Sequence, residues 1–583
     1  MRYFMNKLIV ILAMLNFSAG SSVAQDAPFI RLTEPLKSVN AVSASRQFII
    51  GSTCKTCKLT INALPVNVYP TGAFALEINL IPGDSIVNII ASNDGNRPAR
   101  KNISFLFSLP KPPDTVKTLG IESIQTFPDG NLVLRVGDKI QFRVKAFPAS
   151  TVTTINNTSL YELPVSETGG MPGIYQGEYE IKATDNFLAM KFPVFITGKD
   201  ASKESRETAA AFSVMSPFSS DVACTKGRLA YLEYGLGEDR LGGAKIGYLD
   251  SLIPLKIIGK TGNDFKIELA PNRTAYIPDD LVTLMPKGSF AGKSLTGRWR
   301  VYGDSAYDYV TVGLNARLAY QSMQRINPSV IVVDIFGATG NTNWITQLEN
   351  SKEVENVDYE QLQDEVFRVT IHLRHQQHWG HEIYYNGTMM VIKIKRPPSV
   401  LSLKNMIIAI DAGHGGSNTG AGGPTGVAEK TLALAVSLKL QTALQREGAK
   451  VIMTRSTEKF VDNKDRILFY RDHRPDLLVS IHLNSSADPL RAGGTSSLYR
   501  YIGFRPLSEA INKRLLELGL KEYGNIGSFN FMLNSPTEYP NALVETLFLS
   551  NPEEEMLILD ESFQQKIAEK IVAGIKDFLN AAK

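Results

Sequence analysis

The chain has 583 residues, of which 43% are hydrophobic and 21% are charged. These fractions exclude a largely disordered protein, and at about 150 residues per domain the length predicts about four compact units. The net charge of +4 is a small difference between 62 basic and 58 acidic residues, which argues against a nucleic-acid-binding protein.

The first 24 residues have the pattern of a signal peptide. Arg2 and Lys7 precede an apolar stretch from Leu8 to Phe17, and small residues follow up to Ala24. Ten apolar residues are too few to cross about 30 Å of hydrocarbon as a helix. We therefore predict cleavage near Ala24, export to the periplasm or cell envelope, and no stable membrane insertion afterwards. The alternative is a buried N-terminal helix.

Two blocks of short, alternating apolar strands come next. Residues 25–112 are predicted to form an Ig-like β-sandwich, and residues 113–216 a second sandwich after a proline-rich linker. Cys54 and Cys57 are predicted to form a local disulfide, because no second C-x-x-C completes a zinc site. A redox pair is the alternative, and Cys224 is predicted to be free.

Two further β-rich modules follow. Residues 217–290 resemble a bacterial SH3-like module, with Tyr276-Ile277-Pro278 near the end, and residues 291–398 resemble an AMIN-type wall-targeting domain. The latter module contains four of the seven histidines, which suggest a metal cluster, but strand alternation places the first two on opposite faces. We favour a strand-and-turn role for these histidines, His372, His375, His378 and His381.

From residue 399 to residue 583 the pattern changes. Apolar segments such as MIIAID and DLLVSIHLN alternate with amphipathic, helix-like segments. This alternation predicts an α/β domain with a mostly parallel, twisted sheet that is flanked by helices.

Four side chains of this domain are predicted to meet at one edge of the sheet. His414 follows the first strand in a glycine-rich turn, Glu429 begins a helix, and His482 and Glu545 end two further strands. Ligands of open α/β sheets bind at the carboxyl ends of the strands. Two histidines and a glutamate would leave one position open on zinc, and a further carboxylate would exchange protons with water.

Each of these residues also has a simpler interpretation. Glu429 would be favourable at any helix N-terminus, and a histidine after a strand is often a surface residue. Glu545 is harder to explain in this way, because an unpaired carboxylate in an apolar strand is costly to bury.

Residues 404–583 resemble the zinc-dependent N-acetylmuramoyl-L-alanine amidases of the Amidase_3 type. The resemblance rests on IAIDAGHGG, GxxEK at residues 426–430, VIMTR, Asp465-Arg466, LLVSIHLN and ALVETLFLSNPEE. It implies zinc bound by His414, Glu429 and His482, with Glu545 as general acid/base. It further implies that Asp411 orients the imidazole of His414, and that Asn484 and Arg466 contact substrate or support the site.

The resemblance implies peptidoglycan as the substrate, cut between N-acetylmuramic acid and the L-alanine of the stem peptide. The expected role is cell-wall remodelling or daughter-cell separation, with an activator protein of the divisome or envelope as a partner still to be identified. No long acidic helix is predicted between His482 and Glu545, so we expect an open site. The alternatives are a non-catalytic wall-binding scaffold and a zinc peptidase acting on stem peptides.

Overall fold

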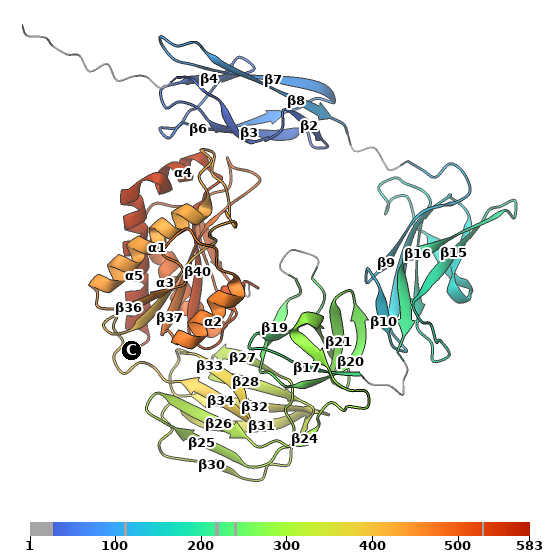
Figure 1. Ribbon diagram of the computed structural model, residues 1–583, viewed down its shortest axis with the longest axis vertical. Coiled ribbons are helices and arrows are strands. Elements are labelled where there is room, and N and C mark those ends of the chain that lie inside the picture. Colours follow the sequence, from blue (N-terminus) through green and yellow to red (C-terminus); the bar gives the residue numbers. More distant parts are fainter. Residues whose placement is uncertain (1–26, 110–113, 216–220, 238–241, 528–529) are drawn as a thin grey trace, which may run out of the picture.

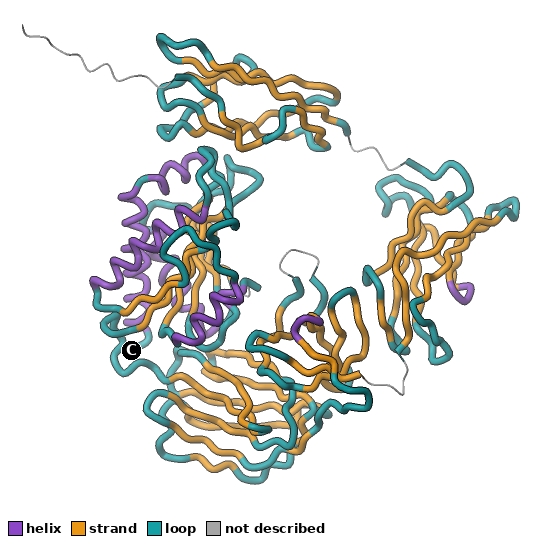
Figure 2. The backbone as a smooth tube through the Cα atoms, in the orientation of Figure 1, coloured by secondary structure: helices purple, strands orange, loops and turns teal. Residues whose placement is uncertain are grey.

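The computed structural model describes residues 27–109, 114–215, 221–237, 242–527 and 530–583. The predicted signal peptide and part of the predicted proline-rich linker lie outside these residues. Within them, all α-helices lie after residue 399, and strands dominate the region before it, where the short helical segments in Figure 2 are the 3-10 turns Ile155–Asn157 and Asp279–Leu281. The prediction of β-rich modules followed by a domain with helices is confirmed. No helix of the described residues is both long and apolar enough to span a bilayer.

The first module consists of two sheets around one core. The sheets have the strand orders β1-β3-β6 and β2-β8-β7-β4-β5, and Ile49 and Phe74 from one sheet share a core with Ile89 and Phe105 from the other. Cys54 and Cys57 form the predicted disulfide, and Cys224 is free. The strands are β1 (Arg31–Glu34), β2 (Val39–Val42), β3 (Arg46–Ser52), β4 (Lys58–Ile61), β5 (Leu64–Val66), β6 (Ala73–Asn79), β7 (Gly83–Ser92) and β8 (Ala99–Phe107).

The second and third modules are joined by strand pairing, because β10 of the second pairs antiparallel with β20 of the third. The second contains β9 (Ile121–Phe127), β10 (Leu132–Leu134), β11 (Lys139–Ala146), β12 (Thr151–Thr154), β13 (Thr158–Glu162), β14 (Ile174–Glu180), β15 (Met190–Thr197) and β16 (Lys203–Val214). The third contains β17 (Asp221–Thr225), β18 (Ala230–Glu233), β19 (Lys245–Leu249), β20 (Pro254–Thr261), β21 (Asp264–Ala270), β22 (Arg273–Pro278) and β23 (Val282–Leu284).

The fourth module is built on a five-stranded sheet, β30-β25-β26-β34-β33, and a four-stranded sheet, β27-β28-β32-β31. Its buried residues form one continuous core with those of the third module. Its strands are β24 (Ser294–Leu295), β25 (Trp299–Gly303), β26 (Tyr307–Val312), β27 (Tyr320–Ile326), β28 (Ser329–Phe336), β29 (Ala338–Thr339), β30 (Ile345–Gln347), β31 (Val354–Gln363), β32 (Val366–Leu373), β33 (His381–Asn386) and β34 (Met389–Lys395).

The C-terminal domain has a six-stranded mixed sheet of order β36-β35-β37-β40-β38-β39. The pairings are parallel except that of β38 with β40, which is antiparallel. The strands are β35 (Ile407–Ala412), β36 (Lys450–Met453), β37 (Leu477–Asn484), β38 (Thr495–Leu498), β39 (Glu522–Ile526) and β40 (Asn541–Phe548). The helices are α1 (Glu429–Arg446), α2 (Asn463–His473), α3 (Arg505–Leu516), α4 (Pro552–Leu559) and α5 (Glu561–Ala581).

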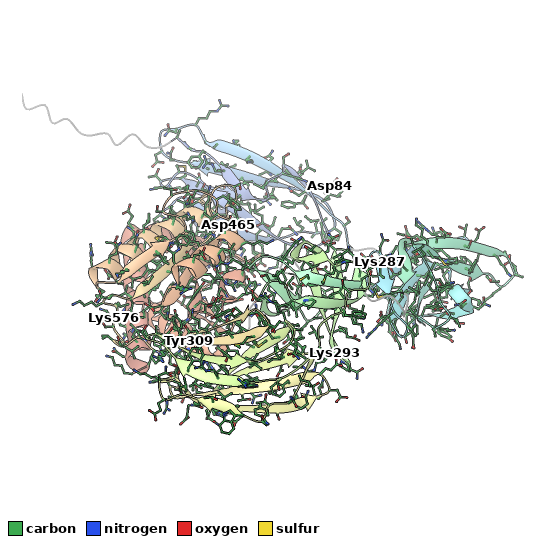
Figure 3. The ribbon with its side chains drawn as sticks, turned by 60° about the horizontal axis from the view of Figure 1, so that its bottom comes forward. Asp84, Lys287, Lys293, Tyr309, Asp465 and Lys576 are labelled. Atoms are coloured by element: carbon green, nitrogen blue, oxygen red, sulfur yellow. A yellow bond between two sulfur atoms is a disulfide. The ribbon has the colours of Figure 1, made fainter. Side chains whose placement is uncertain are left out.

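Helices cover both faces of this sheet. Ile408 and Ile410 of β35 pack in one core with apolar residues of α1, α3 and α5, whereas the alternate residue Ala409 packs with Ile467 and Tyr470 of α2 on the opposite face. Lys576 marks the outer, solvent-facing side of α5 (Figure 3). The predicted site residues lie beside a cavity at the carboxyl ends of β35 and β37 and in the neighbouring β40.

Three modules contact the C-terminal domain. The third does so through Leu229, which shares a core with Ile467 and Tyr470 of α2, and the other two contact it in different ways. The fourth module is attached by buried contacts, since Gly503 N donates to Gln324 Oε1 at 3.0 Å and Gln377 Nε2 donates to Gly503 O at 2.8 Å. In addition, the rings of Trp379 and Phe578 pack at 5.6 Å.

The first module lies at the opposite side of the C-terminal domain, beside α4 (Figure 1). It is held there by surface ion pairs. Arg46 pairs with Asp488 at 2.5 Å and Glu77 with Arg491 at 3.4 Å. The chain thus returns on itself, so that its first module contacts its last domain.

Candidate metal centre

The carboxyl edge of the sheet collects the four predicted site residues. His414 lies two residues beyond the end of β35, and Glu429 is the first residue of α1. His482 and Glu545 are directly paired neighbours on the adjacent parallel strands β37 and β40. Glu545 does not end its strand as predicted, because β40 continues to Phe548.

His414, Glu429 and His482 form a compact group of potential metal ligands. Glu429 Oε1 lies 3.0 Å from His414 Nε2 and 3.0 Å from His482 Nδ1, and one ligand atom from each residue lies within 4.8 Å of the others. Two imidazole nitrogens and a carboxylate oxygen around one point are a donor set that suits zinc. The residues present therefore fit the metal that the sequence predicts.

Glu429 is held in place as an ionised carboxylate. Its oxygens accept hydrogen bonds from Ala421 N at 2.8 Å and Leu483 N at 3.0 Å. Burial alone would raise the pKa of Glu429, but the hydrogen bonds from His414 and His482 outweigh it and lower that pKa well below its usual range. A carboxylate that stays ionised is suited to binding a cation.

Glu545 is in the opposite situation. It is buried, and its Oε2 has no hydrogen-bond partner among the described residues. Burial raises the pKa of Glu545 from 4.5 to about 7, although the nearby His482 and His414 oppose this shift. A buried carboxyl group with a free oxygen and a pKa near neutrality is suited to proton transfer.

Glycines in the turns allow these groups to come together. A Cβ atom on Gly413 would lie 2.5 Å from the His482 ring, and one on Gly420 would lie 2.4 Å from Glu429 Oε2. Gly420 also has a φ of +66°, which glycine adopts most readily. The glycine-rich turn after β35 therefore serves the close approach of side chains at this site.

Asp411 and Arg466 lie beneath the turn and form a buried ion pair. Arg466 Nη1 is 2.8 Å from Asp411 Oδ1, and Arg466 Nη2 donates to the carbonyl oxygen of His414 at 2.5 Å. Asp411 thus reaches the backbone of His414 through Arg466, rather than the imidazole as predicted. Only 2% of the Arg466 side chain is exposed, which leaves little of it for substrate.

Asn484 lies at the end of β37, where its Oδ1 accepts from Ser485 N at 2.7 Å. It lines a cavity of about 690 Å³ together with the metal-binding group, Glu545, Phe460 and Asn463. That Asn484 contacts substrate stays a prediction. Among the described residues between His482 and Glu545, α3 is the only α-helix, and it packs behind the sheet against α5.

Two residues of the site were not singled out by the sequence. Asn418 Oδ1 lies 3.0 Å from His414 Nδ1. Arg455, the arginine of VIMTR, is buried and donates to the carbonyl oxygens of Ala412 and Gly413 at 2.9 and 2.6 Å. The signal for Arg455 was its position in a motif, whereas Asn418 differs in no visible way from other polar residues of the turn.

The four histidines of the fourth module each have a separate partner. His372 contacts Asp358, His375 contacts Glu353, His378 contacts the carbonyl oxygen of Arg325, and His381 contacts Ser322. In the described parts of the chain, the group of donors close enough for a metal is that of His414, Glu429 and His482.

Residues 408–577 match the family Amidase_3, N-acetylmuramoyl-L-alanine amidase, and residues 299–394 match the AMIN domain. N-acetylmuramoyl-L-alanine amidase AmiC of Neisseria meningitidis is 24% identical over 372 residues, which cover 48% of this chain and 89% of AmiC. The probable cell wall amidase LytH of Staphylococcus epidermidis is 31% identical over 181 residues, which cover 31% of this chain and 60% of LytH.

Among solved structures, the N-acetylmuramoyl-L-alanine amidase of Clostridium difficile 630 is 29% identical with a TM-score of 0.30, and the match covers 31% of this chain and all of that one. The matched ranges are the C-terminal domain, with its group of metal-ligand side chains, and the module before it. The chain therefore contains an N-acetylmuramoyl-L-alanine amidase domain of the Amidase_3 type, which follows an AMIN domain.

Proposed function

We propose that this protein is an exported, zinc-dependent peptidoglycan hydrolase that cuts the amide bond between N-acetylmuramic acid and the L-alanine of the stem peptide. His414, Glu429 and His482 would hold the zinc ion. Bound there, zinc would supply Lewis-acid activation of the amide and of the attacking water. The observation that carries the proposal is the free carboxylate oxygen of Glu545 beside this group.

Residues of the chain carry out proton transfer, hold the turn at the site and bind the substrate. Glu545, in its ionised form, takes a proton from the attacking water and then donates it to the nitrogen of the leaving L-alanine. Arg466 and Arg455 hold the backbone of the turn that carries His414. The cavity beside Asn484 accepts the sugar and the first residues of the stem peptide.

The other modules would place this site on the wall. We assign residues 1–24 to a signal peptide, 25–112 to an Ig-like sandwich, 113–216 to a second sandwich, 217–290 to an SH3-like module, 291–398 to the AMIN domain and 399–583 to the catalytic domain. An AMIN domain and similarity to AmiC favour a periplasmic or cell-envelope location. N-terminal sequencing of protein recovered from the envelope tests the predicted cleavage after Ala24.

Digestion of purified peptidoglycan, followed by mass spectrometry of the soluble products, tests the activity. We expect complete stem peptides that begin with a free L-alanine, and we expect their release to stop after chelation and to return with zinc. Peptides cut within the stem would instead indicate a peptidase. A protein that binds the wall, holds no zinc and releases nothing would be a scaffold.

A further inference from the structure

Asn418 occupies a fixed position beside the first histidine of the metal-binding group. It lies in the glycine-rich turn, where its backbone exchanges two hydrogen bonds with Gly415, of 2.9 and 3.0 Å. Its side-chain Oδ1 lies 3.0 Å from His414 Nδ1 and 3.3 Å from Gly420 N. The same amide atom therefore has two neighbours, one a backbone nitrogen and the other an imidazole nitrogen.

These two contacts determine which nitrogen of His414 carries a proton. A backbone N–H group can only donate, so the amide atom that faces Gly420 N is the oxygen of Asn418 rather than its nitrogen. That oxygen can only accept, so His414 Nδ1 must be the donor. The nitrogen that remains to bind a cation is Nε2. In the metal-free protein this atom lies 3.0 Å from Glu429 Oε1 and donates to it, so a cation would replace that proton.

The backbone of His414 is held separately from its ring. His414 has a left-handed φ of 60°, and Arg466 and Arg455 bind the carbonyl oxygens of residues 412–414. These contacts hold the turn and do not involve the imidazole. The ring packs against that of His482 at 4.9 Å, and its Nε2 lies beside Glu429. Asn418 contacts the other ring nitrogen, Nδ1, and so helps to set the orientation of the ring.

We propose that Asn418 is a positioning residue for the metal: it selects the Nδ1–H tautomer of His414 and aims Nε2 at the ion. The role in metal binding rests on the proposed function, whereas the tautomer does not. Partners of this kind on ligating histidines typically contribute about 10- to 100-fold to metal affinity.

Competition with a chromogenic chelator in the full-length protein measures the effect. Asn418→Ala is expected to weaken zinc binding by about 10- to 100-fold. Asn418→Asp is expected to restore most of it, because a carboxylate also accepts from Nδ1. Asn580→Ala, at an exposed position in the last turn of α5, is the matched control and should leave zinc affinity unchanged. Thermal unfolding of each metal-free variant detects loss of folding.

NMR of the zinc-loaded protein with ¹⁵N-labelled histidine gives a second measurement. We expect His414 to carry a proton on Nδ1 in the parent and in Asn418→Asp, and to lose this preference in Asn418→Ala. Zinc affinity of Asn418→Ala within twofold of the parent, or an unchanged tautomer, would overturn the inference. A parent that binds no zinc would instead count against the proposed function.

Discussion

The start of α1 and the middle of β40 each present a buried glutamate to the same site, and the two environments are opposite. Glu429 accepts hydrogen bonds from two backbone N–H groups and contacts two imidazoles, which keep it ionised. Glu545 keeps one oxygen without a partner, and its pKa rises to about 7. The difference shows how one site makes one carboxylate a ligand and another a proton carrier, through hydrogen bonding rather than residue type.

Replacing the proton carrier should have the largest effect. Glu545→Gln retains the shape of the side chain but cannot accept a proton, so amidase activity should fall by about 10²- to 10⁴-fold. Zinc content should stay near that of the parent, as measured by elemental analysis beside the activity assay. Loss of zinc from Glu545→Gln would break the contrast, because Glu545 would then also be a ligand.

Replacing the ligand should affect the metal and the activity together. Glu429→Gln removes a charged ligand from the group. Residues that only hydrogen-bond to a metal ligand typically contribute up to about 100-fold to metal affinity, and the loss of a ligand should lower zinc affinity by more than that. Excess zinc should restore part of the activity of Glu429→Gln. It should not restore the activity of Glu545→Gln. Full activity of Glu429→Gln at limiting zinc would contradict the assignment.

The two glutamates should change the stability of the metal-free protein in opposite directions. The pKa of Glu545 is raised in the folded state, from 4.5 to about 7, so its burial costs stability as pH rises through that window, by about 3 kcal/mol above pH 7. Glu545→Gln should therefore raise the unfolding temperature at pH 8 and leave it nearly unchanged at pH 4.

Glu429 should behave in the reverse way. Its pKa is lowered, so it stabilises the fold above its ordinary value of 4.5, and this contribution is lost as pH falls through the folded-state pKa. Glu429→Gln should lower the unfolding temperature at pH 8. Calorimetry of both variants at both pH values checks the pair, and shifts of the same sign at pH 8 would refute the argument.

Partly exposed carboxylates should give the smallest effect. Glu77 and Asp488 have lowered pKa values because of their hydrogen bonds with Arg46, but each side chain is still 24% exposed to solvent, which weakens the ion pairs. Arg46→Gln should leave the unfolding temperature almost unchanged. It should loosen the first module from the catalytic domain, as should high salt in the parent, which small-angle X-ray scattering detects as a larger radius of gyration.

Much of the site could be predicted because strand ends are visible in a sequence. The apolar segments around residues 407–412 and 477–484 mark parallel strands, and the side chains that follow them must meet at one edge. Asp411 was misplaced because strand alternation puts it, like Ala409, on the face covered by α2, where Arg466 and Tyr470 contact it. Asp411 therefore contacts Arg466, Tyr470 and Ser480 rather than the imidazole that it was predicted to orient.

Other features depend on tertiary structure that no local pattern encodes. The sheet is mixed because β37 and β38 are joined by ten residues without a helix, and a connection of that kind favours antiparallel strands. Asn418 contacts His414 only because the turn folds back through Gly415. The contact of the first module with the catalytic domain joins residues 442 positions apart.

The buried junction between the AMIN and catalytic domains has a mechanical consequence. Backbone and side-chain hydrogen bonds through Gly503 and the packing of Trp379 on Phe578 leave no hinge at that boundary. The two domains should turn as one body. The metal-binding edge would then keep a fixed orientation and distance relative to any surface that the AMIN domain binds, so the enzyme would select the bonds it cuts partly by their direction in the wall.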